Sequence, residues 1–517
     1  MITLHPGKYR LTADMIKNIV LKDEKIELHP DARENVNKSF EFLKEFSKDK
    51  IIYGVNTGFG PMAPYHINDS DIKKLQYNLI RSHASGSGNI ISSECVKASM
   101  LARLNTLLLG YSGVNKSVVR VLQRFINENI YPHIYEHGGV GASGDLVQLS
   151  HLALALIGEG YVKYEGKEYY TGDLMRRKKI QPIDILLREG LALINGTSVM
   201  TGISFLNLIY AKKLVSWTVV LSSLINEIVN SYDDHYSEEL NGVKQHEGQQ
   251  HIAEMMRKVL SDSKQIKRRQ DHLYNGKQQG RILKDKVQEY YSLRCVPQIL
   301  GPIYDAVMNA EKVLENEVNS VNDNPIIDAT HENVYHGGNF HGDYVAFEAD
   351  KLKIAITKLT MLNERQLNFL MNAKINQILP PFVNLGTLGL NLGMQGAQFT
   401  AVSTTAENQM YSNPMYVHSI PNNNDNQDIV SMGTNAALSA KKVVHNSFEV
   451  MAVQLLSLLQ AVDYLDIENK LSSVTKKIYT EARELVPKFS EDTPKFEALE
   501  RLARYLKETD LNLTDSL

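Results

Sequence analysis

The chain has 517 residues, a length that permits a large buried core and about three domains or one extended enzyme body. Its 56 Lys and Arg residues nearly balance its 59 Asp and Glu residues. The formal net charge of −3 therefore gives no reason to expect nucleic acid or an anionic membrane as a partner, and a small-molecule substrate is expected.

Cysteine usage and the first residues bear on the compartment. Cys95 and Cys295 are too few for a disulfide framework, and the start of the chain lacks a basic-then-apolar signal pattern. A cytoplasmic protein is therefore expected. Residues 190–211 carry no charge and are long enough to span a bilayer, but polar residues such as Asn195 and Asn207 favour a buried helix or loop instead.

In the first half, apolar residues recur at helical spacing. Asp31 precedes such a pattern over residues 36–43 and is expected to cap the helix. A second pattern covers residues 96–107, and Gly110 is expected to end it. Strand-like alternation is confined to short pieces such as residues 161–164.

In the second half the helical pattern lengthens. Residues 345–362 and 434–465 predict helices of about 30 residues, which would be about 45 Å long and suit a bundle shared between chains. Residues 233–286, rich in charge and glutamine, predict a solvated excursion. We place the domain boundary near residue 200, with an N-terminal domain over 1–200 and a long-helix domain with a C-terminal extension over 201–517.

A glycine-rich segment, Gly-Gly-Val-Gly-Ala-Ser-Gly-Asp at residues 138–145, runs directly into a helical pattern that starts at Leu146. A glycine-rich turn before a helix also suits phosphate binding, but no Walker lysine follows it here. The segment alone therefore leaves its chemistry open.

Seven short motifs follow one another along the chain: YGVNTGFG at 53–60, GASGDL at 141–146, NGT at 195–197, YSLRC at 291–295, NDNP at 322–325, GNFHG at 338–342 and NQD at 426–428. Together they resemble the histidine/phenylalanine/tyrosine ammonia-lyase family over essentially the whole chain, most closely its bacterial tyrosine ammonia-lyases. The resemblance implies a mainly α fold, a long-helix bundle of the ammonia-lyase (fumarase/aspartase-like) type whose N-terminal domain carries the electrophile-forming loop. It also implies a homotetramer with shared active sites.

The resemblance further implies that Ala142, Ser143 and Gly144 cyclise into 4-methylideneimidazol-5-one (MIO). In the family the glycine nitrogen attacks the alanine carbonyl and water is lost. Gly144 has no side chain to obstruct closure, Ser143 supplies the hydroxyl lost in dehydration, and Ala142 suits a tight turn. The positive end of the following helix would sharpen the electrophile, which makes the substrate amine a better leaving group.

No external cofactor and no metal are expected. The histidines at 133, 137 and 151, or at 336 and 341, lack the paired helical spacing of a hydrolytic zinc site, so structural roles are expected for them.

By resemblance, Tyr53 is the base that removes the β-proton of the substrate, and its site must favour phenolate near neutral pH. Arg294 is the expected clamp for the substrate carboxylate, because a guanidinium makes two parallel hydrogen bonds to such a group. Further family positions contact the substrate or steer the electrophile: Gly60, Asn195, Gln288, Tyr291, Phe340, Glu407, Asn426 and Gln427.

Substrate choice is expected to depend on Ser82 and His83. Taken alone, the Ser-His pair favours histidine, although it also occurs in tyrosine-acting lyases and aminomutases. The sequence departs from histidine lyases at Gln427-Asp428-Ile429 and Gln288-Glu289-Tyr290-Tyr291. We therefore expect L-tyrosine as substrate, with L-histidine, which would give urocanate, as the alternative.

Two other classes remain open. A tyrosine 2,3-aminomutase would retain ammonia and add it back at the β-carbon, depending on the tightness of a lid over residues 58–64. An inactive scaffold is disfavoured because Tyr53, Ser143 and Arg294 are all present.

Overall fold

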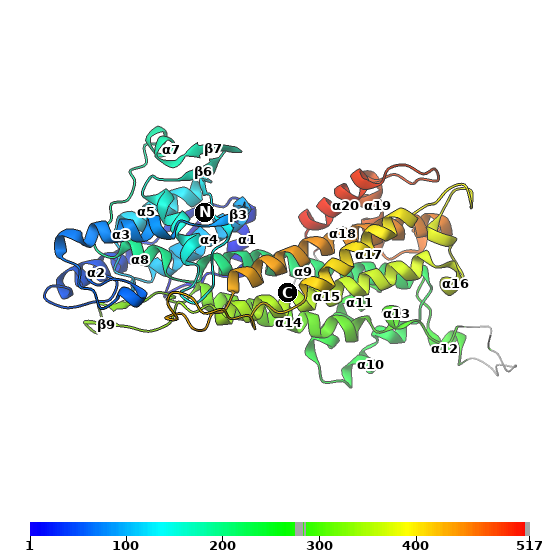
Figure 1. Ribbon diagram of the computed structural model, residues 1–517. Coiled ribbons are helices and arrows are strands. Elements are labelled where there is room, and N and C mark those ends of the chain that lie inside the picture. Colours follow the sequence, from blue (N-terminus) through cyan, green and yellow to red (C-terminus); the bar gives the residue numbers. More distant parts are fainter. Residues whose placement is uncertain (275–282, 284–285, 512–517) are drawn as a thin grey trace. The chain divides into compact units, whose positions relative to one another are not determined.

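The computed structural model describes residues 1–274, 283 and 286–511, and its architecture is mainly helical, as predicted (Figure 1). Contacts divide the chain into two compact units, each of which is discontinuous in sequence. Unit 1 comprises Met1–Ile209, Ala310–Asp350 and Pro414–Lys441, and unit 2 comprises Tyr210–Asn309, Lys351–Asn413 and Lys442–Leu517. The division is thus not a single cut near residue 200, because two later segments return to unit 1.

Four long helices begin in one unit and end in the other: α9 Ser198–Ile228, α14 Val296–Val318, α15 Asp343–Met371 and α18 Gly433–Leu465. The long helices predicted over 345–362 and 434–465 are α15 and α18, so the helical spacing there is confirmed.

Unit 1 contains shorter helices and all the described strands. Its other helices are α1 Ala13–Leu21, α2 Pro30–Phe46, the 3₁₀ helix Gly60–Met62, α3 Asp69–His83, α4 Ser93–Leu108, α5 Lys116–Asn127, α6 Leu146–Leu156, α7 Thr171–Arg177 and α8 Glu189–Ile194. Its strands are β1 Ile2–Leu4, β2 Ile26–Leu28, β3 Ser87–Ile90, β4 Tyr131–Pro132, β5 Tyr135–His137, β6 Tyr161–Tyr164, β7 Lys167–Tyr170, β8 Ile326–Asp328 and β9 Asn333–Tyr335.

The strands form small sheets with short registers. β1 and β2 pair in parallel, whereas β3 with β5, β6 with both β4 and β7, and β8 with β9 pair antiparallel. The strand predicted over 161–164 is β6, which forms a hairpin with β7 next to α7 (Figure 1). Gly166, with a φ of +76°, supplies the left-handed turn that this hairpin needs.

The predicted end of α4 and the predicted cap of α2 can be compared with the structure. Gly110, with a φ of +79°, follows the end of α4, as expected for a helix stop. The predicted cap of α2 is wrong: the helix begins at Pro30, so Asp31 lies in its first turn, and the ring nitrogen Nδ1 of His29 accepts the Asp31 N–H. Proline at the first helical position fixes the start two residues earlier than a cap at Asp31 would.

Unit 2 is built from long helices together with short connecting ones. The elements that lie wholly in it are the 3₁₀ helices Asp233–Tyr236, Pro381–Val383 and Glu468–Lys470, and α10 Glu238–Gly242, α11 Glu247–Leu260, α12 Arg269–His272, α13 Tyr291–Arg294, α16 Ala373–Asn376, α17 Gln395–Tyr411, α19 Ser473–Leu485 and α20 Phe496–Glu508.

Buried polar side chains join the unit 2 parts of these helices in a specific register. Thr360 of α15 and Ser447 of α18 exchange a 2.6 Å hydrogen bond between their hydroxyls, and the Asn408 amide of α17 donates to both. Because all three side chains are buried, a slip of one helix would leave several polar groups without partners.

The expected solvated excursion over 233–286 is only partly observed, since residues 275–282 and 284–285 lie outside the described residues. Within the described part, α11 is not a solvated segment. It buries an apolar face at Ile252, Met255, Met256 and Val259, a spacing that the many charged neighbours obscured in the sequence.

Two helices in the described part of the chain, Ser198–Ile228 and Gly433–Leu465, are long and apolar enough to cross a membrane by length and composition alone. In both, 78% of the most apolar window is buried inside the protein. The expectation that residues 190–211 form buried core is confirmed, because residues 190–209 are buried throughout α8, the Asn195-Gly196-Thr197 turn and the start of α9.

Candidate active site

The glycine-rich loop ends where α6 begins, at Leu146, as predicted. Gly144 has a φ of +70°, and a Cβ on it would overlap the carbonyl group of Gly196. The two glycines form a parallel bridge, and the Asp145 N–H donates to the Gly196 carbonyl over 2.8 Å. A residue with a side chain therefore cannot replace Gly144 without moving the turn that contains Asn195.

Ser143 is contacted by two other predicted site residues. Its hydroxyl accepts a 3.0 Å hydrogen bond from Gln427 Nε2, and its carbonyl accepts one of 3.3 Å from Asn195 Nδ2. The other amide atom of Asn195, Oδ1, is buried and has no hydrogen-bond partner within the described part of the chain. This carbonyl oxygen is thus left free to accept a hydrogen bond from a further group.

Hydrogen bonds to the carbonyl groups of Val140 and Gly141 hold the rest of the loop. The Gly141 carbonyl accepts from Gly342 N at 3.0 Å and from Ser431 Oγ at 3.1 Å, and Met432 N donates to the Val140 carbonyl at 2.9 Å. Phe340, predicted to pack beside the prosthetic ring, lies two residues before Gly342 and is half-buried. The segments that hold the loop are thus far from it in sequence.

Asp145 is a site residue that the sequence analysis missed. It is fully buried, and its Oδ2 accepts from Val199 N at 2.8 Å and Met200 N at 2.9 Å, at the start of α9. Thr434 donates to the other carboxylate oxygen. Burial raises the pKa of Asp145 to about 6, while these hydrogen bonds oppose the increase.

Arg103 is a second residue that was missed. It is fully buried on α4, and its Nη1 donates to the Asn195 carbonyl over 2.8 Å. Burial lowers the pKa of this guanidinium to about 10. A lone arginine in the apolar pattern over residues 96–107 was the available signal, since a charge on a buried helix face needs a specific partner.

Tyr53 and Gly60 are brought together by a hydrogen bond in which Gly60 N donates to the Tyr53 phenol oxygen over 3.2 Å. The ring of Phe59 stands edge-on to that of Tyr53, with centroids 6.2 Å apart. Gly60 has a φ of +53°, and a Cβ on it would lie 2.7 Å from the side-chain amide nitrogen of Asn423. The lid segment therefore approaches the loop that carries Gln427.

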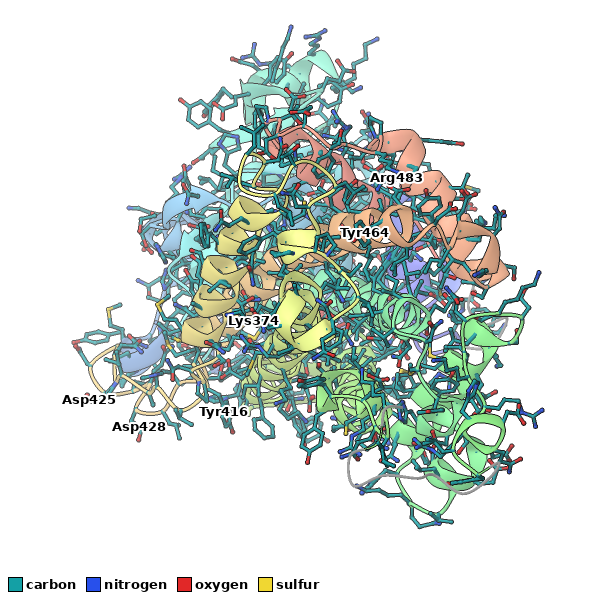
Figure 2. The ribbon with its side chains drawn as sticks, turned by 90° about the vertical axis from the view of Figure 1, so that its right-hand side faces the viewer. Lys374, Tyr416, Asp425, Asp428, Tyr464 and Arg483 are labelled. Carbon is teal, nitrogen blue, oxygen red and sulfur yellow. The ribbon has the colours of Figure 1, made fainter. Side chains whose placement is uncertain are left out.

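That loop precedes α18 and is closed by an antiparallel bridge between Asn422 and Gln427. Figure 2 shows Asp425 and Asp428 along it, and both are exposed. Asn426, between them, is also exposed and donates its N–H to the Asn423 carbonyl over 3.1 Å. The loop thus turns Gln427 inward to Ser143 while its neighbours face outward.

Ser82 and His83 lie at the end of α3 and contact each other, with 3.0 Å between Ser82 Oγ and His83 Nδ1. His83 Nδ1 also lies 3.0 Å from the Leu79 carbonyl, which can only accept. In the neutral ring Nδ1 therefore carries the proton, and Nε2 is left as a hydrogen-bond acceptor.

The remaining predicted residues belong to unit 2. Gln288, Tyr291 and Arg294 line one cavity there of about 780 Å³. The Arg294 guanidinium lies over the Tyr291 ring, 4.8 Å from its centroid, and its Nε is buried without a hydrogen-bond partner among the described residues. The cavity thus presents the positively charged Arg294 side chain, whose Nε–H donor has no partner among the described residues.

Glu407, also in unit 2, lies on α17, which runs beside α18 (Figure 1). Its carboxylate accepts a 2.6 Å hydrogen bond from Asn446 Nδ2 and is 3.4 Å from Lys442 Nζ, both on α18. These contacts fix the direction of the Glu407 side chain.

Comparisons with known proteins show which family the chain resembles over most of its length. The profile of the family described as aromatic amino acid lyase matches residues 11–484. A tyrosine 2,3-aminomutase of Chondromyces crocatus is 38% identical over 498 residues, covering 95% of this chain and 94% of that protein. A histidine ammonia-lyase of Staphylococcus aureus is 38% identical over 511 residues, covering 98% of each. The solved tyrosine aminomutase from Streptomyces globisporus is 33% identical, with a TM-score of 0.93 over 99% of this chain and 100% of that one.

Proposed function

The chain belongs to the aromatic amino acid lyase family, and we propose that it removes ammonia from L-tyrosine to give trans-p-coumarate. The observation that carries the proposal is the loop Ala142-Ser143-Gly144, which is contacted by Asn195 and Gln427 and pressed against Gly196. In the reaction the Cα–N bond breaks and one hydrogen leaves the β-carbon, so the enzyme needs an electrophile, a base and a carboxylate clamp.

The loop fits the MIO group that the family uses. The absence of space for a side chain on Gly144 and the left-handed backbone there suit a ring closed through its nitrogen. The group would supply an electrophilic methylidene carbon that activates the substrate amine for departure. Asn195 would orient it through the Ser143 carbonyl, and Gln427 would hold the Ser143 hydroxyl before it leaves as water.

Tyr53 is the proposed base for the β-proton. Its phenol oxygen accepts the Gly60 N–H, and a donor aimed at this atom stabilises negative charge on it. The edge-on Phe59 ring limits rotation of the Tyr53 ring. The proton would move from the β-carbon of the substrate to this oxygen.

Arg294 is the proposed carboxylate clamp. Its buried Nε lacks a partner, and a substrate carboxylate would satisfy it in a bidentate pair. Gln288 and Tyr291 line the same cavity and would add polar contacts to the substrate. Glu407, held by Asn446, would face the substrate amine, as the family resemblance implies.

The preference for tyrosine rests on His83. Because its Nδ1 is committed to the Leu79 carbonyl, Nε2 would accept a hydrogen bond from the para-hydroxyl of tyrosine. Phenylalanine offers no such donor and would leave the imidazole unpaired. The ring N–H of histidine could make the same bond, so histidine ammonia-lyase activity is the second candidate, supported by the relative of that name.

The test is incubation of the purified protein with tyrosine, histidine and phenylalanine separately, followed by ultraviolet spectra and amino acid analysis. Coumarate supports the proposal, whereas urocanate as the main product replaces it with the second candidate. β-Tyrosine would identify an aminomutase, a candidate favoured by the relative from Chondromyces crocatus. The variant Ser143→Ala should remain folded and lose nearly all turnover; wild-type turnover by this variant would refute the MIO proposal.

We also propose a homotetramer with shared active sites. Large apolar side chains are exposed on α17, among them Phe399 at 66% and Met410 at 59%, and Leu390 before this helix is 75% exposed. Such residues suit contact with other copies of the chain. Mixing inactive Tyr53→Phe subunits with inactive Arg294→Ala subunits should restore part of the activity; no recovery after verified subunit exchange would argue for sites within single chains.

A further inference from the structure

Two short, equivalent sequence segments lie side by side in unit 1. Strand β1 ends at Leu4 and strand β2 at Leu28, and His-Pro follows each of them. Their parallel register pairs Leu4 with Leu28. The next residue of each strand is therefore a histidine at the same level. The rings of His5 and His29 have centroids 4.2 Å apart.

A carboxylate completes this group. Asp31, in the first turn of α2, has its Oδ2 3.4 Å from His5 Nε2 and 3.5 Å from His29 Nδ1. One ligand atom from each of the three residues lies within 4.8 Å of the other two. None of the three belongs to the candidate active site.

The spacing agrees with a common metal geometry. Zinc binds histidine nitrogen and carboxylate oxygen at about 2.0–2.2 Å, so neighbouring ligand atoms of a tetrahedral site are about 3.3 Å apart. The two measured separations, 3.4 and 3.5 Å, are close to this value. Only the wider His–His approach would have to close, by rotation of the half-exposed His29 side chain.

The bonding of His5 also points to a missing ligand. Its side chain is 10% exposed, yet its Nδ1 is buried and has no hydrogen-bond partner in the described parts of the chain. Its Nε2 has only the long contact to Asp31. A cation bound to Nε2 would replace this long contact with a metal–ligand bond, and Nδ1 would then carry the ring proton.

We propose that His5, His29 and Asp31 bind a divalent transition-metal ion such as Zn²⁺, with water in the remaining position. Two neutral imidazoles and one carboxylate are a ligand set that such ions accept. Binding through His29 Nδ1 would replace the bond this nitrogen accepts from Asp31 N–H, and that exposed N–H would then bond to water. The ion would join the end of β1 to the start of α2.

The experiment is equilibrium dialysis of chelator-treated full-length protein against Zn²⁺, with bound metal measured by mass spectrometry. The wild type should bind one ion per chain that His5→Ala and Asp31→Asn lose or bind at least about tenfold more weakly. His29→Asn is the third variant, because asparagine caps a helix well but cannot replace the imidazole. The exposed His418→Ala is the matched control and should bind like the wild type.

A second measurement separates binding from folding defects. Zn²⁺ should raise the melting temperature of the wild type and of His418→Ala but not that of the three ligand variants, whose circular dichroism should remain native. Equal uptake of Zn²⁺ by the wild type and all three ligand variants would overturn the proposal, as would loss of uptake in the control. Deamination activity without added metal should be the same in His5→Ala and the wild type.

Discussion

Replacement of Gly196 by alanine tests whether the contact between two glycines supports the site. Gly196 has a φ of +140°, where residues with side chains are strained by about 1–3 kcal/mol. A Cβ there would also overlap Arg103 Nη1 and lie 2.5 Å from the Asn322 carbonyl oxygen, and crowding of this kind costs a further 1–3 kcal/mol, roughly. We therefore expect Gly196→Ala to lose about 2–6 kcal/mol of stability in total.

The matched control is Gly166→Ala. Gly166 also has a positive φ, +76°, but a Cβ on it would meet no atom within 4 Å, so only a backbone cost of about 1–2 kcal/mol is expected. Thermal unfolding followed by circular dichroism, at one protein concentration, compares the two variants with the wild type. Steady-state kinetics then measures kcat.

Gly196→Ala should melt several degrees below Gly166→Ala and should lose most of its kcat, because Asn195 and the Ser143 carbonyl move with the turn. Gly166→Ala should keep wild-type kinetics. If both variants melt at the same temperature and Gly196→Ala keeps its kcat, the packing of Gly196 against Gly144 and Arg103 does not hold the site, and the reasoning fails.

Three further predictions concern single side chains. His83→Phe should shift the ratio of kcat/KM values from tyrosine towards phenylalanine by about ten- to a hundredfold, the effect of one lost hydrogen bond in a desolvated pocket; an unchanged ratio removes His83 from substrate selection. Since burial raises the folded pKa of Asp145 from 3.8 to about 6, its contribution to stability should fall by about 3 kcal/mol as pH rises from about 3 to 7. Asp145→Asn should lack that decline, and identical pH profiles of unfolding for the two proteins would contradict it. Gln427→Leu should lower kcat about two- to tenfold by impairing MIO formation, because Gln427 holds the Ser143 hydroxyl that leaves as water, whereas the exposed Asp425→Asn should not; equal rates in both would show that this bond is not used.

The sequence predicted features that depend on neighbouring residues. The spacing of apolar side chains located α15 and α18, Gly110 marked the end of α4, and the alternation over residues 161–164 located β6. The chemistry proposed for the Ala142-Ser143-Gly144 loop came from the resemblance to the family, because the segment alone left it open.

Long-range contacts could not be predicted in the same way. Thr434 reaches Asp145 across 289 residues, and Arg103 reaches the Asn195 carbonyl across 92. No local periodicity records such pairs, since they depend on how α4, α9 and α18 pack in unit 1. The cap of α2 was missed for a different reason: His29 competes with Asp31 for the role, and Pro30 decides it.

The contacts around Ser143 also set an order in time. Its hydroxyl is bound by a residue 284 positions later in the chain, and its carbonyl by one 52 positions later. At roughly 5–20 residues per second, a ribosome needs about 15–60 s after Ser143 to deliver Gln427. The pocket is therefore complete only near the end of synthesis. The methylidene carbon of the proposed group would then form inside a completed pocket. It would be protected from the amines and thiols that surround a nascent chain.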